Sequence, residues 1–366
     1  MGLSLRASLA LVSVTLLTLA GCAVEEPVED AVIEIIEEEV VVVEGPESPR
    51  HPLTGVELGS NVVAGPSIAI KIDNTPAGRP QVGIAAADIV FEELVEGGVT
   101  RYLAVYHTAV PDEVGPVRSG RPQDADLVRS LGGVFVFSGV GNSNVREIIR
   151  GAGLQLVEHD TSGGTPDGEY FFRSSRKPAP LNLHIEAADL AGSYANLTSP
   201  VQQFEFKTDP AESSAVLLGD DVESLRVTFS KAIESVWEWD AASGLYLKFL
   251  SNGSPDLDAD GTQISATNVL IFTPNYFDVE ALPSAKISGS EETALIATGG
   301  KMVEGVFDAT AFGEPIALHD GEGNPLHLSP GTTFILLAPG VGSTASGVQP
   351  GFVTYVSNGE TITRNF

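Results

Sequence analysis

The chain contains one cysteine, Cys22, and this limits how its fold can be held together. A single thiol can form neither a disulfide within the chain nor a site of several thiolates on a metal ion. Core packing, hydrogen bonds and ion pairs must therefore stabilise the folded part. Hydrophobic residues make up 43% of the sequence, which is enough for a sizeable core. The sequence from Cys22 onward has about 345 residues, and at roughly 150 residues per domain this length suggests two domains.

The residues before Cys22 have the order of a secretory signal peptide. Arg6 supplies a positive charge, Ala7 to Thr18 form a short apolar run, and Ala20-Gly21 place small residues before the cysteine. A membrane-spanning anchor is the alternative, but the apolar run is shorter than the roughly 20 residues that such a helix needs. We therefore predict a lipoprotein signal peptide over residues 1–21 and acylation of Cys22. The mature protein is then extracytoplasmic and lipid-anchored to the cell membrane.

The net charge of the chain argues against some classes of partner. The formal net charge is −29, whereas nucleic acids and anionic lipid surfaces attract clusters of Lys and Arg. We therefore expect no nucleic-acid partner. Ten acidic residues and no basic residue lie between Glu25 and Glu47, which predicts a solvated acidic tether over residues 22–50. The apolar residues within Val32–Ile36 and Val40–Val43 leave open the alternative that a short helix or strand here docks on a partner.

Residues 51–197 carry both strand and helix patterns. Ser67–Ile72 alternates, with three isoleucines on one face, and this spacing predicts a strand. Further strands are expected at Val90–Val95, Thr100–His107 and Val134–Phe137, and helices at Gln123–Leu131, Ser143–Arg150 and Glu186–Ala195. The fold class that we predict is α+β, beginning with a mixed α/β layered domain.

Residues 198–366 contain short apolar runs that are separated by Gly, Pro, Asn and Asp. This spacing predicts a mainly antiparallel β domain of the sandwich or rolled-sheet type. The expected strands are Val201–Phe206, Leu225–Phe229, Val236–Asp240, Leu245–Phe249, Asn268–Phe272 and Thr333–Leu337.

An unusually polar series lies among the strand patterns of the first domain. Gly97-Gly98 predicts a two-residue hairpin turn, because such turns need positive φ. In that register Arg101 is diagonal to Glu92 and Glu96 on one face, and Glu93 lies on the other face. Half-buried charges must be paired or serve a ligand. The candidate cluster consists of Lys71, Asp73, Arg79, Glu92, Glu96, Arg101, Arg118, Ser119 and Arg121.

Two interpretations of this cluster stay open. Arg118 and Arg121 flank Ser119 and a glycine, and guanidinium groups beside a hydroxyl suit a carboxylate or a phosphate. Alternatively the arginines pair internally with Asp88, Glu92, Glu93 or Glu96. We favour internal pairing, because ion networks perturb charges as often as functional sites do. A deep pocket with both arginines and no carboxylate would favour a ligand site, whereas closed ion pairs would favour a scaffold.

Several blocks of the sequence resemble the YerB-like lipoproteins. They are Arg79–Gly83, Ala87–Glu92, Val95–Arg101 and Val114–Pro122, within a dense match from about Pro52 to Leu190. The later part is similar more loosely, at Asn268-Val269 and in the glycine-rich hairpins from Gly299 onward. The resemblance implies N- and C-terminal YerB-type domains over 51–197 and 198–366, and no enzymatic activity is established for the family.

The same resemblance has a functional implication and one departure. Some relatives are linked to cell-wall synthesis and sporulation, which implies a partner-binding or regulatory role. The family usually shows an Ala-Pro-His-Asn-Leu-Tyr-like stretch, and this chain has Ala179–His184 with Leu181 in place of the histidine. A role for that histidine therefore does not transfer to this chain.

Metal and cofactor motifs are weak. Asp256, Asp258 and Asp260, followed by Gly261, resemble the first half of a calcium loop, but Thr267 stands where the closing acid would be. A turn between strands is the favoured interpretation, and weak calcium binding is the alternative. No histidines have zinc-ligand spacing, so we expect no metal and no cofactor.

The sequence favours a binding or regulatory module of the cell envelope over an enzyme. Envelope or cell-wall synthesis proteins are the expected partners. The alternative is an enzyme or carrier that acts on an anionic wall polymer, or on its lipid-linked precursor, through an arginine-lined cleft.

Overall fold

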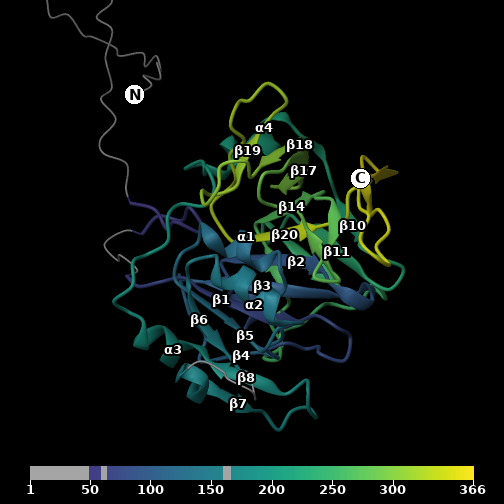
Figure 1. Ribbon diagram of the computed structural model, residues 1–366. Helices are drawn as coiled ribbons and strands as arrows, with labels where there is room; N and C mark the ends of the chain where they lie inside the picture. The colour runs from purple at the N-terminus through teal and green to yellow at the C-terminus, as the bar shows by residue number, and fades with distance from the viewer. Residues whose placement is uncertain (1–48, 59–63, 160–165) are drawn as a thin grey trace, which may run out of the picture. The chain divides into compact units, whose positions relative to one another are not determined.

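The computed structural model describes residues 49–58, 64–159 and 166–366. The predicted signal peptide, Cys22 and the tether up to residue 48 lie outside the described residues. Residues 49–366 form one compact unit, which is mixed and strand-rich with few helices (Figure 1). Among the described helices, none combines the length and the apolar character that crossing a bilayer requires.

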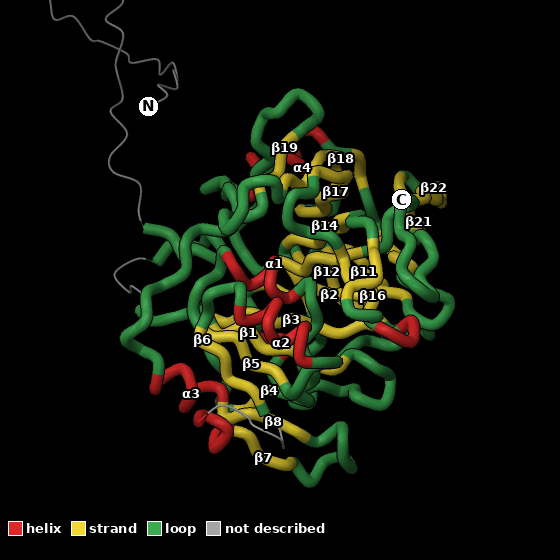
Figure 2. Tube along the Cα trace, in the orientation of Figure 1, coloured by secondary structure: helices red, strands yellow, loops and turns green. Residues whose placement is uncertain are grey.

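An 11-stranded sheet runs through both halves of the chain, in the order β19-β18-β17-β14-β20-β2-β3-β1-β5-β6, with β9 beside β18 (Figure 2). The first half supplies β1 (Ile68–Asp73), β2 (Ile89–Leu94), β3 (Thr100–Tyr106), β5 (Val134–Phe137) and β6 (Gln155–Glu158). The second half supplies β9 (Asp220–Asp221), β14 (Asn268–Phe272), β17 (Glu291–Thr298), β18 (Lys301–Asp308), β19 (Ala317–His319) and β20 (Thr333–Leu337).

The halves meet where β20 pairs in parallel with β2 on one side and with β14 on the other. All residues of β14 and β20 are buried, as expected for apolar strands inside a sheet. The predicted boundary near residue 197 falls in a segment without helix or strand, yet the two halves that it separates share this sheet and one hydrophobic core.

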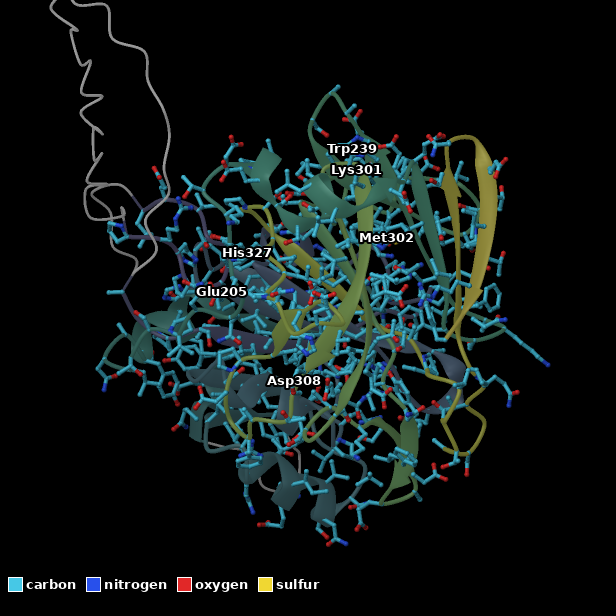
Figure 3. All side chains as sticks on the ribbon, turned by 90° about the horizontal axis from the view of Figure 1, so that it is seen from above. Glu205, Trp239, Lys301, Met302, Asp308 and His327 are labelled. Atoms are coloured by element: carbon cyan, nitrogen blue, oxygen red, sulfur yellow. The ribbon has the colours of Figure 1, made fainter. Side chains whose placement is uncertain are left out.

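A second sheet has six strands in the order β13-β12-β11-β10-β21-β22, and all its pairings are antiparallel. Its strands are β10 (Ser224–Thr228), β11 (Glu234–Asp240), β12 (Leu245–Phe249), β13 (Ser265–Ala266), β21 (Phe352–Ser357) and β22 (Glu360–Asn365). Trp237 of β11 packs edge-on against Phe334 of β20, with ring centroids 4.8 Å apart. Trp239 of the same strand lies beside the β17–β18 turn, near Lys301 (Figure 3). The six-stranded sheet therefore packs against the large sheet.

Two small sheets and four helices complete the described fold. The small sheets are β15 (Tyr276–Val279) with β16 (Leu282–Ala285), and β4 (Glu113–Val114) with β8 (Leu183–Glu186) and β7 (Phe171–Arg173). The helices are α1 (Asp124–Arg129), α2 (Ser143–Arg150), α3 (Ala187–Ser193) and α4 (Ser214–Leu218), with short 3-10 turns at Ile84–Ala86, Glu96–Gly98, Pro166–Tyr170 and Pro210–Glu212.

Most sequence-based elements are found where the patterns place them, and one is not. The bounds of α2 agree because Asn142 caps the helix, accepting hydrogen bonds from the N–H groups of Asn144 and Val145. The strand predicted at Val201–Phe206 is wrong, because this extended segment forms only a single bridge, between Phe206 and Leu328.

Candidate functional site

The turn between β2 and β3 differs from the predicted two-residue hairpin. Val95 donates its N–H to the carbonyl of Val99, so the loop has three residues, Glu96 to Gly98, and both glycines have positive φ. Glu93 is therefore opposite Arg101, and Glu92 is opposite Tyr102. This one-residue slip places Arg101 on the face of Glu93, and the predicted position of Arg101 beside Glu92 is wrong.

The register divides the predicted cluster between the two faces of the large sheet. Lys71, Asp73 and Arg101 share the face of Glu93, because Lys71 and Asp73 are two residues apart and Asp73 is opposite Arg101. Glu92 points to the opposite face. The carboxyl ends of β1, β2, β5 and β6 lie at one edge of the sheet, because these strands are parallel. This edge is where open α/β sheets usually bind ligands.

A fully buried triad lies on the first face. Lys71 Nζ contacts Glu93 and lies 2.8 Å from Asp124 Oδ1, and all three side chains have 0% exposure. Burial and the adjacent Asp124 together raise the pKa of Glu93 to about 8, although Lys71 opposes the rise. Glu93 is therefore mainly protonated at neutral pH, which leaves Lys71 and Asp124 as the ion pair. Sequence patterns did not include Glu93 and Asp124 in the cluster.

Arg121, Arg101 and Glu96 form a second group at the carboxyl end of β2. Arg121 Nε donates to Glu96 Oε2 at 2.8 Å, its Nη2 contacts Glu96 Oε1, and Arg101 Nη2 lies 3.5 Å from the same Oε1. Burial alone would raise the pKa of Glu96, but the Arg121 hydrogen bonds and charge, aided by Arg101, hold it at about 2. Ser119 contributes its carbonyl oxygen, which accepts from Arg101 Nη1 at 2.8 Å.

Arg118 is the most exposed of the three arginines. Its Nε lies 2.7 Å from Asp73 Oδ2, and its side chain is 26% exposed. Asp73 is itself buried, and its Oδ1 accepts from the backbone N–H of Thr75. All three arginines therefore have a carboxylate partner, which is the arrangement expected of a scaffold.

The opposite face carries a separate network around Glu92. Glu92 Oε1 accepts from Asn74 and from Thr100, each at 2.9 Å, and Oε2 accepts from Ser235 of β11 at 2.8 Å. Lys248 of β12 lies 4.0 Å from Glu92 and 3.4 Å from Asp256. Arg79 joins this network by donating to Asn74 Oδ1. The contacts of Glu92 with Ser235 and Lys248 connect the two sheets through side chains that have almost no access to water.

The calcium-like segment forms a tight turn whose carboxylates have other partners. Leu257 bridges to Gln263, and Asp258 accepts from the backbone N–H groups of Gly83 and Ala85. Asp256 is buried beside Lys248. Asp260 is exposed and accepts from the N–H of Thr262. Within the described ranges, no group of three or more His, Cys, Asp or Glu side chains is arranged to hold a metal ion.

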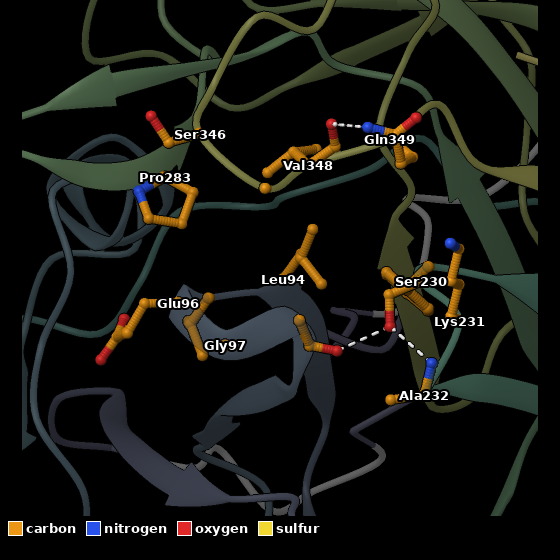
Figure 4. A pocket seen from close by; sticks show the side chains of 14 residues that line it. Leu94, Glu96, Gly97, Ser230, Lys231, Ala232, Pro283, Ser346, Val348 and Gln349 are labelled. Atoms are coloured by element: carbon orange, nitrogen blue, oxygen red, sulfur yellow. Dashed lines mark hydrogen bonds between the residues drawn. The ribbon is translucent and has the colours of Figure 1, made fainter.

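A cavity of about 530 Å³ opens beside the β2–β3 turn, and we call it the junction cavity (Figure 4). Its walls come from both halves of the chain: Leu94–Gly98, Phe229–Ala232, Pro283 and Ser346–Gln349. Leu94, Phe229 and Val348 are at most 8% exposed and supply apolar surface.

The turn that lines this cavity is held from two sides. On one side, Arg121 and Arg101 bind Glu96. On the other side, Ser230 Oγ donates to the carbonyl of Gly98 at 2.6 Å (Figure 4). Tyr276 fixes the strand end before the turn, because its hydroxyl accepts from Leu94 N–H and donates to the Leu337 carbonyl. The ion pairs therefore position one wall of the junction cavity. No pattern in the sequence indicated this cavity, because its other walls are distant in sequence.

Comparisons with known proteins cover both halves of this chain. Residues 53–199 match the N-terminal domain described as "Protein of unknown function (DUF3048)", and residues 225–335 match the C-terminal domain of that description. The "Putative lipoprotein YerB" of Bacillus subtilis (strain 168) is 33% identical over 135 residues, which are 37% of this chain and 39% of that protein.

A solved structure agrees with the fold. The crystal structure of the YerB protein from Bacillus subtilis superposes with a TM-score of 0.67 at 22% sequence identity, covering 80% of this chain and 97% of that chain. At that identity the likeness concerns the fold. Together with the two domain matches, it shows that the chain belongs to the YerB-like family, whose N- and C-terminal domains have no established function.

Proposed function

We propose that this protein is a lipid-anchored binding module of the cell envelope that holds its ligand in the junction cavity. The lipoprotein name of the Bacillus subtilis relative supports the location, and the signal-peptide pattern before Cys22 supports the anchor. We propose binding rather than catalysis as the activity. A link to cell-wall synthesis stays a prediction that rests on the family resemblance alone.

The observation that carries this proposal is the position of the junction cavity. Its volume of about 530 Å³ is within the range of small-molecule sites. It also adjoins the carboxyl end of β2, the sheet edge at which ligands bind in related architectures. Apolar walls with a few polar groups at the rim are typical of a site for an amphipathic ligand. Lys231 and Gln349 supply a cation and an amide, which suit a carboxylate or another acidic group on that ligand.

The pairing of the arginines supports a scaffold role for the ion cluster. Arg121 is 4% exposed and bound to Glu96, so a ligand would have to displace that carboxylate to reach it. Such a displacement would leave Glu96 beside a second anion. The ion pairs instead hold Glu96–Gly98 in place as a wall of the cavity.

A second candidate function rests on Arg118. Its side chain is 26% exposed, and its Nε lies 2.7 Å from Asp73 Oδ2. The remaining guanidinium N–H groups suit a phosphate of an anionic wall polymer or of its lipid-linked precursor. In this second candidate function, the protein is an enzyme or carrier that acts on such a polymer or precursor.

The test uses 8-anilinonaphthalene-1-sulfonate, an apolar anion that becomes fluorescent in such cavities, titrated into the folded full chain. Ala232→Trp places a large side chain at the cavity wall, and Ala242→Trp is the control at another exposed turn of the same sheet. We expect saturable binding to the wild type and to Ala242→Trp, and at least about tenfold weaker binding to Ala232→Trp, the change that follows a loss of about 1.4 kcal/mol. Equal binding to all three proteins would refute the cavity as the site.

A parallel titration with inorganic polyphosphate addresses the second candidate. If the arginines serve only the scaffold, Arg118→Met leaves any binding of polyphosphate unchanged. Loss of saturable polyphosphate binding in Arg118→Met, with normal anilinonaphthalene sulfonate binding, would support the polymer function and contradict a purely scaffold role for Arg118.

A further inference from the structure

The strand β22 forms a long open edge of the six-stranded sheet. It pairs with β21 on one side and is the last strand in its order (Figure 2). It has six residues, whereas β19 and β6 at the ends of the large sheet have three and four, and β13 at the other end of its own sheet has two. Open edges are usually kept short or protected by Pro, Lys or a bulge. β22 has no Pro or Lys, and its register with β21 is continuous.

The hairpin geometry determines which backbone groups face outward. Asn358 and Gly359 both have positive φ and form a two-residue turn, so the flanking pair Ser357 and Glu360 is hydrogen-bonded. Hydrogen-bonded and non-hydrogen-bonded pairs alternate along the strand. The N–H and C=O groups of Thr361, Thr363 and Asn365 therefore point away from β21. Within the described chain, no recorded backbone hydrogen bond reaches these groups from another segment.

The sequence of β22 is complementary to itself when the strand is reversed. Glu360-Thr361-Ile362-Thr363-Arg364 has Ile362 at its centre, a threonine on each side, and opposite charges at its ends. We propose that β22 pairs antiparallel with β22 of a second copy of this chain, with the two Ile362 residues opposite each other.

This register satisfies both the backbone and the charges. Thr361 of one copy is opposite Thr363 of the other, and both have outward-facing groups, so each such pair exchanges both of its N–H···O bonds. Glu360 lies opposite Arg364 of the other copy, and opposite charges across a strand pair are stabilising. Arg364 also binds Glu304 of its own chain, which holds the guanidinium beside the edge. Ile362 is 38% exposed in one copy and is covered by its counterpart in the pair.

The pairing is expected to be weak in solution. One strand edge buries far less than the about 800 Å² per partner of a stable interface. Anchoring two copies in one membrane raises their effective concentration without new contacts. A covalent trap is therefore the appropriate assay for the purified protein. The inference is independent of the junction cavity, and the trapping experiment on the purified protein does not depend on the proposed lipid anchor.

Disulfide trapping tests the register directly. In a full chain that carries Cys22→Ser, Ile362→Cys introduces the only thiol, because Cys22 is the single natural cysteine. In the proposed register the two Cα atoms are about 4.5 Å apart, within the range of about 4.4–6.8 Å that a disulfide spans. Glu360→Cys is the matched control on the same exposed strand. Its two Cα atoms are offset by about four residues, or about 13 Å along the strand.

We expect Ile362→Cys to form a covalent dimer at least about tenfold faster than Glu360→Cys, whose Cα separation no disulfide spans. Adding Thr363→Pro to Ile362→Cys should slow the dimer formation, because it removes an outward N–H while Pro is tolerated on an edge strand. Unchanged tryptophan fluorescence confirms that this variant folds. Equal rates for the two thiols, no dimer at any concentration, or no effect of Thr363→Pro would each overturn the proposal.

Discussion

Lys71, Glu93 and Asp124 bring three ionisable groups into a space without access to water. Two of them lie on strands whose other residues are mainly apolar. Such groups are costly to bury, and removing one partner leaves an uncompensated charge. The triad therefore makes β1, β2 and α1 depend on one another.

Lys71→Met is expected to destabilise the protein by about 3–5 kcal/mol, because Asp124 then keeps a buried charge without a cation. Lys231→Met is the control, since Lys231 is exposed, and it should change the free energy of unfolding by less than about 0.5 kcal/mol. Urea titrations of both variants provide the comparison. A Lys71→Met variant as stable as the control would show that the triad does not stabilise the fold.

The raised pKa of Glu93 predicts that the stability of the protein falls as the pH rises. Its pKa is about 8 in the folded protein, against an ordinary value of 4.5, so the folded state retains the proton between these values. The stability that Glu93 contributes is therefore complete below pH 4.5 and is lost as the pH rises toward 8. Glu93→Gln has the shape of the protonated acid and does not titrate.

The wild type should therefore lose stability relative to Glu93→Gln as the pH rises, by up to about 1.4 kcal/mol per pH unit within that window. Urea titrations of both proteins at several pH values between 5 and 8 measure this difference. A difference that stays constant over the window would mean that Glu93 is ionised in the folded protein.

Among the elements, β5 begins at a close contact between two backbone segments. Gly132 and Gly133 precede it, both with positive φ, and a Cβ added at Gly133 would lie 2.2 Å from the Ser67 carbonyl oxygen. A Cβ at Gly132 would meet no atom within 4 Å. Alanine substitutions at these two positions therefore distinguish the cost of a positive φ from the cost of a steric clash.

Gly132→Ala should cost about 1 kcal/mol through its positive φ alone, whereas Gly133→Ala should cost at least about 2 kcal/mol more, because β5 must move away from β1. Thermal or urea unfolding of the two variants tests this. Equal losses would argue against the close approach of β1 and β5.

The elements also show what local sequence can predict. Alternation was sufficient to predict β1, a short apolar run to predict β5, and apolar residues at helical spacing to predict α2, since these patterns depend on neighbouring residues. The β2–β3 register was not predictable, because Gly97-Gly98 fits a two-residue and a three-residue loop equally well, and one residue of slip moves every side chain to the other face. The polar cluster was visible as charges within apolar strands, but its division between two faces depends on that register.

For the whole molecule, the pairing of β2 with β20 joins the two halves, although their residues are 89–94 and 333–337. No local pattern indicates a pairing at that separation. The two sequence domains are therefore parts of one sheet in the described chain, connected further by the Glu92 network to Ser235 and Lys248.

The shared sheet predicts that both halves unfold together. Trp237 and Trp239 are the only tryptophans and lie in the second half, so their fluorescence reports on that half. Hydrogen exchange of β1 and β5 reports on the first half. In urea the two signals should change at the same concentration, as expected for one cooperative unit. Two separate midpoints would show that the halves fold independently.

The central claim is that the arginine cluster is an internal scaffold that holds the turn beside the junction cavity. A double-mutant cycle of Glu96→Gln and Arg121→Met, followed by urea titration, tests this claim most directly. Glu96 is 42% exposed, so solvent screening should limit the coupling energy to about 1–2 kcal/mol. A coupling of that size and favourable sign supports the scaffold. Effects that add within about 0.5 kcal/mol would contradict it and leave the arginines available for a ligand.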